Sequence, residues 1–157
     1  HTWRMKPMSK SSFVYVTYIR TTPAKLWQAL TDPEYTRQYW MGTHQECDWK
    51  VGSSWKLVFA DGKVADAGEV VEIEPEKKLV LKWRNQFMPE MNAEGDTRMQ
   101  ADLEQMGDTM KLTIIHEMDR ADSKFIGAVG SGWPMILASL KSLLESGVAL
   151  DLSCGKH

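Results

Sequence analysis

The side chain best suited to acid–base chemistry is His116, which lies in a stretch where apolar and polar residues alternate. Over residues 109–117 it shares one face of a predicted strand with Leu112 and Ile114. Burial there would lower its pKa, and the neutral imidazole could donate to a ligand carbonyl or act as a general base. Glu117 falls on the opposite face and is not placed to orient it. His116 is therefore the one candidate for catalysis, and a histidine that is merely hydrogen-bonded in the core is the alternative.

A second group of chemically capable side chains follows the predicted strand over residues 44–49. His44, Glu46 and Asp48 alternate along one face, a geometry that could hold a metal ion, whereas Cys47 points the other way. No second group of residues with the spacing of metal ligands accompanies them. The pattern is therefore better explained as the polar, solvent-exposed face of a strand. The sequence also lacks a G-x-S-x-G motif, a P-loop and a dinucleotide fingerprint. We therefore expect no metal, no cofactor and no serine nucleophile.

The elements that position these groups follow one another in an order typical of an α+β fold. A strand over 13–20 precedes two short helices, each beginning where a capping side chain, Thr22 or Asp32, is followed by proline. About six antiparallel strands come next, joined by hairpins such as the two-residue turn predicted at Asp61 and Gly62. One helix ends the domain. The sequence thus predicts an antiparallel sheet with helices on one face.

The last element has an apolar stripe of helical period between residues 133 and 144. Ser131 is the predicted N-cap, Pro134 then lies in the first turn, and Gly147 ends the helix. Because long antiparallel sheets curl, we expect a curved sheet wrapped around this long C-terminal helix. Such a sheet closed over one helix encloses space, and the predicted function depends on that space.

Large apolar side chains are concentrated on the strand faces that would point toward the helix. The chain has seven Trp and ten Met, more than a domain of this size needs to fill itself. A register one residue away would present Lys56, Lys82 and Lys111 instead. The side chains form either a solid core or the lining of a cavity, and the number of flat and flexible groups favours a cavity. The predicted ligand-binding residues are Trp55, Leu57, Phe59, Leu81, Trp83, Phe87, Met99, Leu103, Leu112, Ile114, His116, Trp133, Ile136, Leu137 and Leu140.

A long segment without regular period, residues 85–97, carries Phe87, Met88 and Met91 among polar residues. Long loops in compact domains often act as lids over binding sites. We expect this segment to be irregular and to cover the mouth of the cavity. The alternative is a connector whose apolar residues patch the edge of the sheet.

Length and composition restrict the class of protein. The 157 residues predict an N-terminal tail over 1–12, a single domain over 13–147 and a C-terminal tail over 148–157. A net charge of −2 with scattered basic residues argues against a nucleic-acid binder. No stretch approaches the roughly 20 apolar residues of a membrane span, and the start has no apolar core like that of a signal peptide. With only Cys47 and Cys154, no disulfide framework is expected and a reducing cytoplasm is favoured.

Several motifs occur in an order that is more specific than any of them alone. They are the runs 26–34 (LWQALTDPE), 48–55 (DWKVGSSW), 68–73 (GEVVEI) and 78–80 (KLV), and Gly132-Trp133 with the stripe of Leu137, Leu140 and Leu144. Together they resemble the START-like (SRPBCC) superfamily, and most closely the bacterial homologues of the activator of the ninety-kilodalton heat-shock-protein ATPase. Lys50 and Ser53 stand where the family pattern has Arg and a second Gly. The resemblance covers about residues 13–147.

This resemblance implies the helix-grip fold, which is also seen in the birch pollen allergen. Superfamily members mostly hold apolar or amphipathic ligands, some relatives are polyketide cyclases, and no catalytic set is shared. Fold alone does not transfer a function. We expect a protein, rather than an enzyme, that binds a hydrophobic small molecule (a lipid, polyketide or aromatic compound) between the sheet and the C-terminal helix. The alternatives are a cyclase or dehydratase that uses the same cavity and a co-chaperone-like partner of the ninety-kilodalton heat-shock protein that acts through its surface. The sequence is also compatible with a homodimer.

Overall fold

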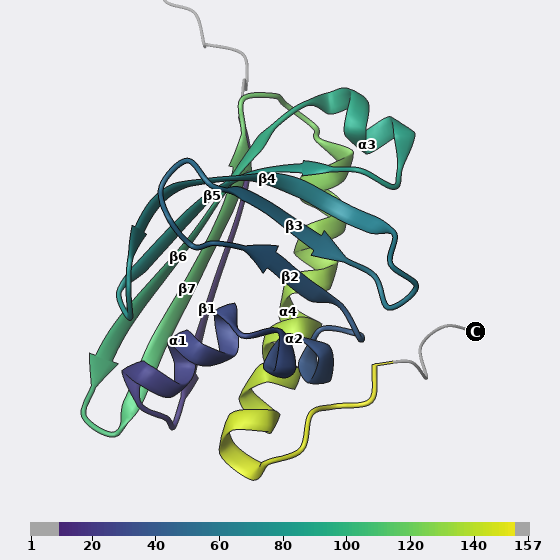
Figure 1. Ribbon diagram of the computed structural model, residues 1–157. Coiled ribbons are helices and arrows are strands. Elements are labelled where there is room, and N and C mark those ends of the chain that lie inside the picture. Colours follow the sequence, from purple (N-terminus) through teal and green to yellow (C-terminus); the bar gives the residue numbers. More distant parts are fainter. Residues whose placement is uncertain (1–9, 153–157) are drawn as a thin grey trace, which may run out of the picture.

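Seven strands form one antiparallel sheet in the computed structural model, which describes residues 10–152. The strand order is β1-β7-β6-β5-β4-β3-β2, so the first strand closes one edge and the short β2 the other. The sheet curves over a long helix and leaves its other face free of helices (Figure 1). This confirms the predicted α+β helix-grip architecture. The strands are β1 Ser11–Ile19, β2 His44–Cys47, β3 Ser54–Val58, β4 Val64–Glu74, β5 Lys78–Asn85, β6 Thr97–Met106 and β7 Thr109–Met118.

Two short helices follow β1, as predicted, and share one capping residue. Helix α1 (Pro23–Thr31) begins at Thr22, whose hydroxyl accepts the backbone N–H of Lys25. Asp32 ends α1 and also caps α2 (Pro33–Tyr39), since its carboxylate accepts the N–H of Glu34. Proline at the first position of each helix gives up an N–H that would have had no partner there. The tight break places Trp40, directly after α2, beneath the sheet.

The C-terminal helix begins earlier than the sequence analysis predicted. Helix α4 runs Lys124–Ser146, its N-cap is Ser123 rather than Ser131, and Pro134 lies inside it. The Ser123 hydroxyl accepts the N–H of Ile126, as a capping residue does. The predicted start was wrong because the added turns are rich in glycine and lack a helical signal of their own. Gly147 ends the helix in the left-handed conformation, as predicted.

A short helix interrupts the segment that was predicted to be irregular. Helix α3 (Pro89–Glu94) lies beside the N-terminal end of α4 (Figure 1). The carboxylate of Glu94 accepts hydrogen bonds from the Ser123 hydroxyl at 2.6 Å and from the backbone N–H groups of Lys124 and Phe125 at 2.9 and 3.3 Å. Residues about thirty positions apart in the chain therefore hold the two helices together, which a local pattern does not reveal.

The remaining corrections concern the ends of elements. The turn between β3 and β4 encloses the three residues 60–62 rather than two: the N–H of Phe59 donates to the carbonyl of Lys63 at 2.8 Å, and Gly62 takes a φ of 90°. Strand β1 begins at Ser11, two residues before the predicted domain boundary. Residues 1–9 and 153–157 of the predicted tails lie outside the described residues, and so does Cys154.

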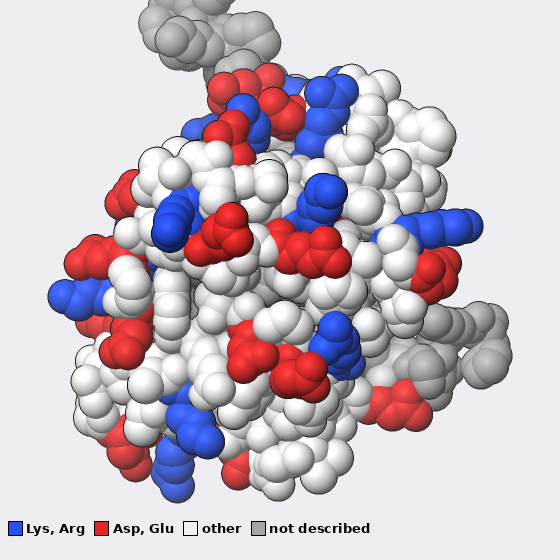
Figure 2. Space-filling view, in the orientation of Figure 1, with Lys and Arg blue, Asp and Glu red and all other residues white. Residues whose placement is uncertain are grey.

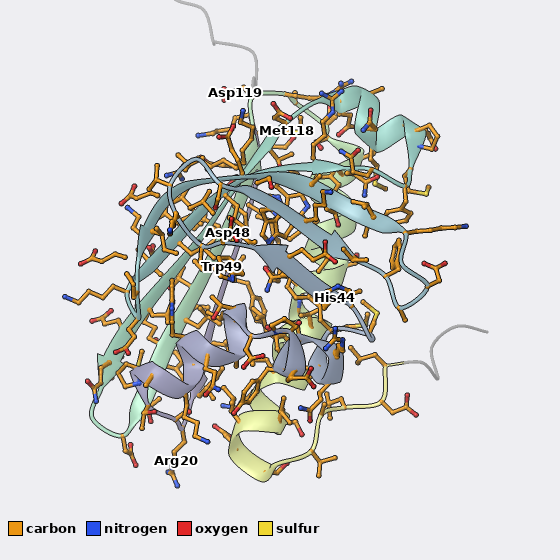
Figure 3. All side chains as sticks on the ribbon, in the orientation of Figure 1. Arg20, His44, Asp48, Trp49, Met118 and Asp119 are labelled. Atoms are coloured by element: carbon orange, nitrogen blue, oxygen red, sulfur yellow. The ribbon has the colours of Figure 1, made fainter. Side chains whose placement is uncertain are left out.

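The predicted inward faces of the strands are buried against α4. Because β-strand side chains alternate, the opposite faces carry the lysines and other polar groups. Figure 3 shows side chains lying between the sheet and α4. The buried residues of this set are Trp55, Leu57, Leu79, Leu81, Trp83, Met99, Ala101, Leu103, Leu112, Ile114, His116, Trp133, Ile136, Leu137 and Leu140.

Candidate functional site

A pocket of about 230 Å³ lies between strands β3–β5 and the N-terminal half of α4. Its other walls come from the end of α2 and from the segment that contains α3. Side chains from distant parts of the chain thus meet at one end of the curved sheet. The lining residues are Trp40, Met41, Leu57, Asp66, Trp83, Asn85, Phe87, Met91, Phe125, Ala128, Val129, Gly132, Trp133 and Ile136.

Three tryptophans from three different elements form much of the apolar wall. Trp40 follows α2, Trp83 lies on β5 and Trp133 on α4. Their ring centroids are 6.2 Å apart for Trp40 and Trp83, 5.3 Å for Trp40 and Trp133, and 5.9 Å for Trp83 and Trp133. Such separations are those of favourable aromatic pairs. The three indoles hold the walls of the pocket in fixed relative positions.

The deeper region behind these rings is nearly filled. A second void of only about 20 Å³ is bounded by the same three tryptophans and by residues of the inner core. A volume of that size has room for about one water molecule. The core directly behind the three indoles therefore leaves no room for a ligand, and the apolar space under β3–β5 lies at the end where α3 is.

Two polar side chains in the pocket, Asp66 and Asn85, were not singled out by the sequence analysis. They face each other across β4 and β5, and the amide Nδ2 of Asn85 donates to Asp66 Oδ1 at 3.2 Å. The amide orientation is consistent, because Asn85 Oδ1 accepts the N–H of Met88 at 2.8 Å. Asp66 was missed because the return strand after the Asp61–Gly62 turn was predicted over residues 67–74, which left the aspartate just outside it. Its alternation with Val64 and Gly68 is the signal that could have found it.

Asp66 is a buried carboxyl group without a cationic partner among residues 10–152. Only 6% of its surface is exposed, and no lysine, arginine or histidine in that range forms an ion pair with it. Burial raises its pKa to about 6, against smaller opposing effects of Trp83 and Asn85. At neutral pH it is therefore mostly a carboxylate inside an apolar pocket.

The indole N–H of Trp83 is an unsatisfied buried donor beside this carboxyl group. It is close enough to lower the pKa of Asp66 but makes no hydrogen bond of ordinary geometry. No other side-chain nitrogen or oxygen in the described part of the chain is both buried and without a partner. Leaving such a donor unpaired costs about 1–3 kcal/mol. The polar corner of the pocket, formed by Asp66, Asn85 and the Trp83 N–H, therefore has unused hydrogen-bonding capacity.

His116 lies behind the pocket wall, with both ring nitrogens engaged. Trp133 Nε1 can only donate, so its contact at 3.1 Å makes His116 Nδ1 the acceptor and leaves the proton on Nε2. Nε2 donates to Thr97 Oγ1 at 2.9 Å, and that hydroxyl donates to the Trp83 carbonyl at 2.7 Å. Burial lowers the pKa of His116 to about 3. The neutral imidazole thus positions Trp133 and has no free nitrogen for a general base.

The segment after β5 contributes two residues to the pocket. Phe87 is half exposed and meets the half-buried Phe59 edge to face, with ring centroids 5.1 Å apart. Met91, on α3, also lines the pocket, whereas Met88 does not. The segment therefore lies at the pocket mouth, and its action as a lid stays a prediction.

The predicted ligand-binding residues divide into three groups. Those in the pocket are Leu57, Trp83, Phe87, Trp133 and Ile136. Met99, Ile114 and Leu137 border the small inner void, together with Trp83 and Trp133. Neither space is lined by Trp55, Phe59, Leu81, Leu103, Leu112, His116 or Leu140.

The remaining functional expectations concern metals, membranes and charge. His44 Nε2 contacts Glu46 at 3.0 Å, while Asp48 lies beyond the other end of β2 (Figure 3), and residues 10–152 contain no group of three metal-ligating side chains. No helix in that range is long and apolar enough to cross a membrane. On the face shown in Figure 2, basic and acidic side chains are interspersed.

Comparison with known proteins places this geometry in a family. Residues 20–145 match the family model described as Activator of Hsp90 ATPase homolog 1-like protein. No curated protein sequence gives a significant match.

Solved structures with a similar fold come from several organisms. A Mesorhizobium loti protein is 25% identical with a TM-score of 0.74, covering 86% of this chain and 97% of its own. An HSP90 activator from Plasmodium falciparum is 24% identical with a TM-score of 0.69, covering 85% and 95%. CalU16 from Micromonospora echinospora is 19% identical with a TM-score of 0.69, covering 87% and 77%. The chain therefore belongs to the family of proteins that resemble homolog 1 of the activator of the Hsp90 ATPase.

Proposed function

We propose that this protein binds a hydrophobic small molecule in the pocket between the sheet and the C-terminal helix. The observation that carries the proposal is a space of about 230 Å³ whose lining is aromatic or aliphatic except at Asp66 and Asn85. An apolar wall with a few placed polar groups is typical of small-molecule sites. The volume favours an aromatic compound of one or two rings over a long-chain lipid.

The expected affinity is moderate. A ligand that buries about 200 Å² of apolar surface gains about 5 kcal/mol at 25 cal/mol per Å², before the costs of association are subtracted. Since 5 kcal/mol corresponds to a dissociation constant of about 0.2 mM, binding in the sub-millimolar to millimolar range follows for a ligand without polar contacts. Selectivity among apolar ligands is expected to be loose, because Met41 and Met91 can repack around different shapes.

The test uses 1-naphthylmethanol as a neutral probe and two matched glycine variants of α4. Gly132 lines the pocket and Gly127 does not, and an added Cβ meets no atom within 4 Å at either position. In Gly132→Leu the new side chain is expected to fill the pocket, while Gly127→Leu leaves it open. NMR shifts of the indole N–H resonances on titration, and the melting temperature, report binding.

We expect the wild type and Gly127→Leu to bind the probe, and Gly132→Leu to lose binding while remaining folded. A wild type that shows no change in indole resonances or melting temperature with this probe and a panel of related aromatic compounds would contradict the proposal. Equal binding by both leucine variants would place the ligand elsewhere.

A second candidate function, binding of a protein partner, is favoured by the outer face of β1. Val14, Val16 and Tyr18 are 57%, 41% and 47% exposed and lie in a row on this edge strand. Exposed apolar rows on an edge strand are suited to protein contacts. Together with the family relationship, this face supports a contact with a chaperone ATPase.

Titration with the ninety-kilodalton chaperone tests this candidate, with Val16→Lys as the disrupting variant and Lys56→Glu, on the distant β3, as its control. Loss of binding in Val16→Lys alone supports the chaperone contact. Light scattering on the chain by itself detects a second copy bound through the same face, and concentration-dependent dimers abolished by Val16→Lys would replace the chaperone with a homodimer.

A further inference from the structure

The polar corner of the pocket indicates what kind of apolar ligand it takes. Asp66 lies at the pocket wall on β4, between Leu57 on β3 and Asn85 on β5. These strands arch over the N-terminal half of α4, and α3 lies beside that half (Figure 1). A ligand in the pocket would meet the carboxyl group inside a lining that is otherwise apolar except for Asn85.

The hydrogen bonds of Asp66 are incomplete. A carboxylate can accept about four hydrogen bonds, whereas the side chain of Asp66 accepts one of ordinary geometry, from Asn85 at 3.2 Å. The buried N–H of Trp83 lies nearby without a partner of its own. Buried charges in proteins are normally paired with an opposite charge, and Asp66 has no such pair among residues 10–152.

The rest of the lining suits a cation. Indole attracts cations through its π face more strongly than the other aromatic side chains do, and Trp40, Trp83 and Trp133 all line the pocket. Among the described residues that line the pocket, Asp66 is the sole ionisable one, and none of them is a lysine, arginine or histidine that would repel a positive group. His116, which lies behind the wall, is held neutral by burial because its pKa is lowered to about 3.

We propose that the ligand is an amine, in which an aromatic or aliphatic body fills the apolar pocket and a positively charged nitrogen pairs with Asp66. This inference rests on the proposed small-molecule function and adds the charge of the ligand. The ammonium supplies the missing counter-ion and donates to the carboxylate, while the tryptophan rings surround the body next to it.

The experiment compares three probes that share one ring system and differ in charge: 1-naphthylmethylamine, 1-naphthylmethanol and 1-naphthoate. In wild-type protein at pH 8 the amine is expected to bind at least about tenfold more tightly than the alcohol, the gain typical of a charge-assisted hydrogen bond. The anion is expected to bind more weakly than the alcohol, because Asp66 repels it. Calorimetry or NMR titration gives the three affinities.

Asp66→Asn is the matched variant, since it keeps the shape of the side chain and removes its charge. The variant is expected to bind the alcohol within about threefold of wild type and to lose the preference for the amine. Should the variant not fold, the wild type alone supplies the same comparison. Its amine-to-alcohol affinity ratio should fall as the pH drops from 8 to 5, because Asp66 is the only titrating group in the lining.

The outcomes separate the two proposals. If the alcohol and the amine bind equally in wild type, or the anion binds best, the amine inference is overturned and the apolar pocket stands. If an amine preference persists undiminished in Asp66→Asn, the carboxylate is not its cause and the inference also fails. If no probe of the series binds to wild type, the small-molecule function itself fails.

Discussion

Trp133 donates its indole N–H to Nδ1 of His116 at 3.1 Å, and this contact connects the one buried histidine of residues 10–152 to the wall of the pocket. It fixes the imidazole in the Nε2-protonated form, which in turn donates to Thr97. The chain of hydrogen bonds ends on the carbonyl of Trp83, the tryptophan on the opposite wall. The His116 ring also meets the Trp83 indole edge to face, with ring centroids 5.0 Å apart, so the histidine contacts both indoles.

The first prediction is that Trp133→Phe destabilises the fold through His116. Phenylalanine keeps an aromatic ring but leaves Nδ1 as a buried acceptor without a donor, which costs about 1–3 kcal/mol in the free energy of unfolding. Trp27→Phe is the control, since this half-buried indole makes no hydrogen bond to another described residue. Urea denaturation measures both variants, and an equal loss in the two would show that the contact with His116 contributes nothing.

The sequence predicted the buried faces of the sheet because alternation assigns each strand residue to one side. It could not place Asp66 or Glu94, since their roles come from residues on other elements. Asp66 matters through Asn85 on the next strand, and Glu94 through the backbone of α4 about thirty residues later. It also could not tell a filled core from a pocket, because that depends on how closely side chains such as Trp83 and Trp133 meet.

The second prediction concerns pH, where Asp66 and His116 act in opposite directions. His116 has a pKa of about 3 when folded and 6.5 as its ordinary value, so the unfolded chain binds the extra proton between these limits and acid destabilises the fold. Asp66 has a pKa of about 6 when folded and 3.8 ordinarily, so here the folded chain binds the extra proton and acid stabilises it. Between about pH 6 and 3.8 the changes in the free energy of unfolding with pH that come from Asp66 and from His116 are opposite in sign and cancel.

Asp66→Asn removes the contribution of Asp66 to the pH dependence of stability and leaves that of His116. Relative to wild type, the variant is expected to lose about 1.4 kcal/mol of stability for each pH unit of acidification between about pH 6 and 4. Urea denaturation of both proteins at several pH values gives the difference in their free energies of unfolding. The other titrating groups contribute equally to both proteins and cancel in this difference. Parallel stability profiles for the two proteins would show that Asp66 has an ordinary pKa.

The third prediction is that Gly68 on β4 tolerates no side chain. A Cβ at this position would lie 1.7 Å from the carbonyl oxygen of Lys82 on the neighbouring strand β5, a backbone atom that cannot move aside without separating the strands. Gly68→Ala is expected to lose at least about 3 kcal/mol, the upper end of the usual cost of overpacking.

Gly127→Ala is the matched control, because a Cβ there meets no atom within 4 Å and the site is an exposed turn of α4. This variant should gain up to about 1 kcal/mol from the higher helix propensity of alanine. Thermal or urea unfolding of the two variants tests the contrast, and a Gly68→Ala protein as stable as wild type would mean that β4 and β5 are not packed so closely.

The fourth prediction is that Glu94 stabilises the pocket end of the molecule by capping α4. Burial by itself raises the pKa of Glu94, but the hydrogen bonds from Ser123 and from the N–H groups of Lys124 and Phe125 outweigh it and hold the pKa below its ordinary value. The ionised carboxylate therefore stabilises the fold above the ordinary pKa of the group, and this contribution is lost as the pH falls through the lowered value. Glu94→Gln should cost about 1–2 kcal/mol at neutral pH, the range for a lost N-cap with a favourable charge.

Glu90→Gln separates this cap from a surface ion pair. Glu90 lies on the same short helix and pairs with Lys124 Nζ at 3.1 Å, but both side chains are largely exposed. An exposed pair contributes less than about 1 kcal/mol, so this variant should remain close to wild type. Hydrogen exchange localises the effect: in Glu94→Gln the amides of α3 and the first turn of α4 should exchange faster, because α3 is no longer held to the helix. Uniform exchange in both variants would show that Glu94 does not join the two helices, and the wall that carries Met91 would then depend on other contacts.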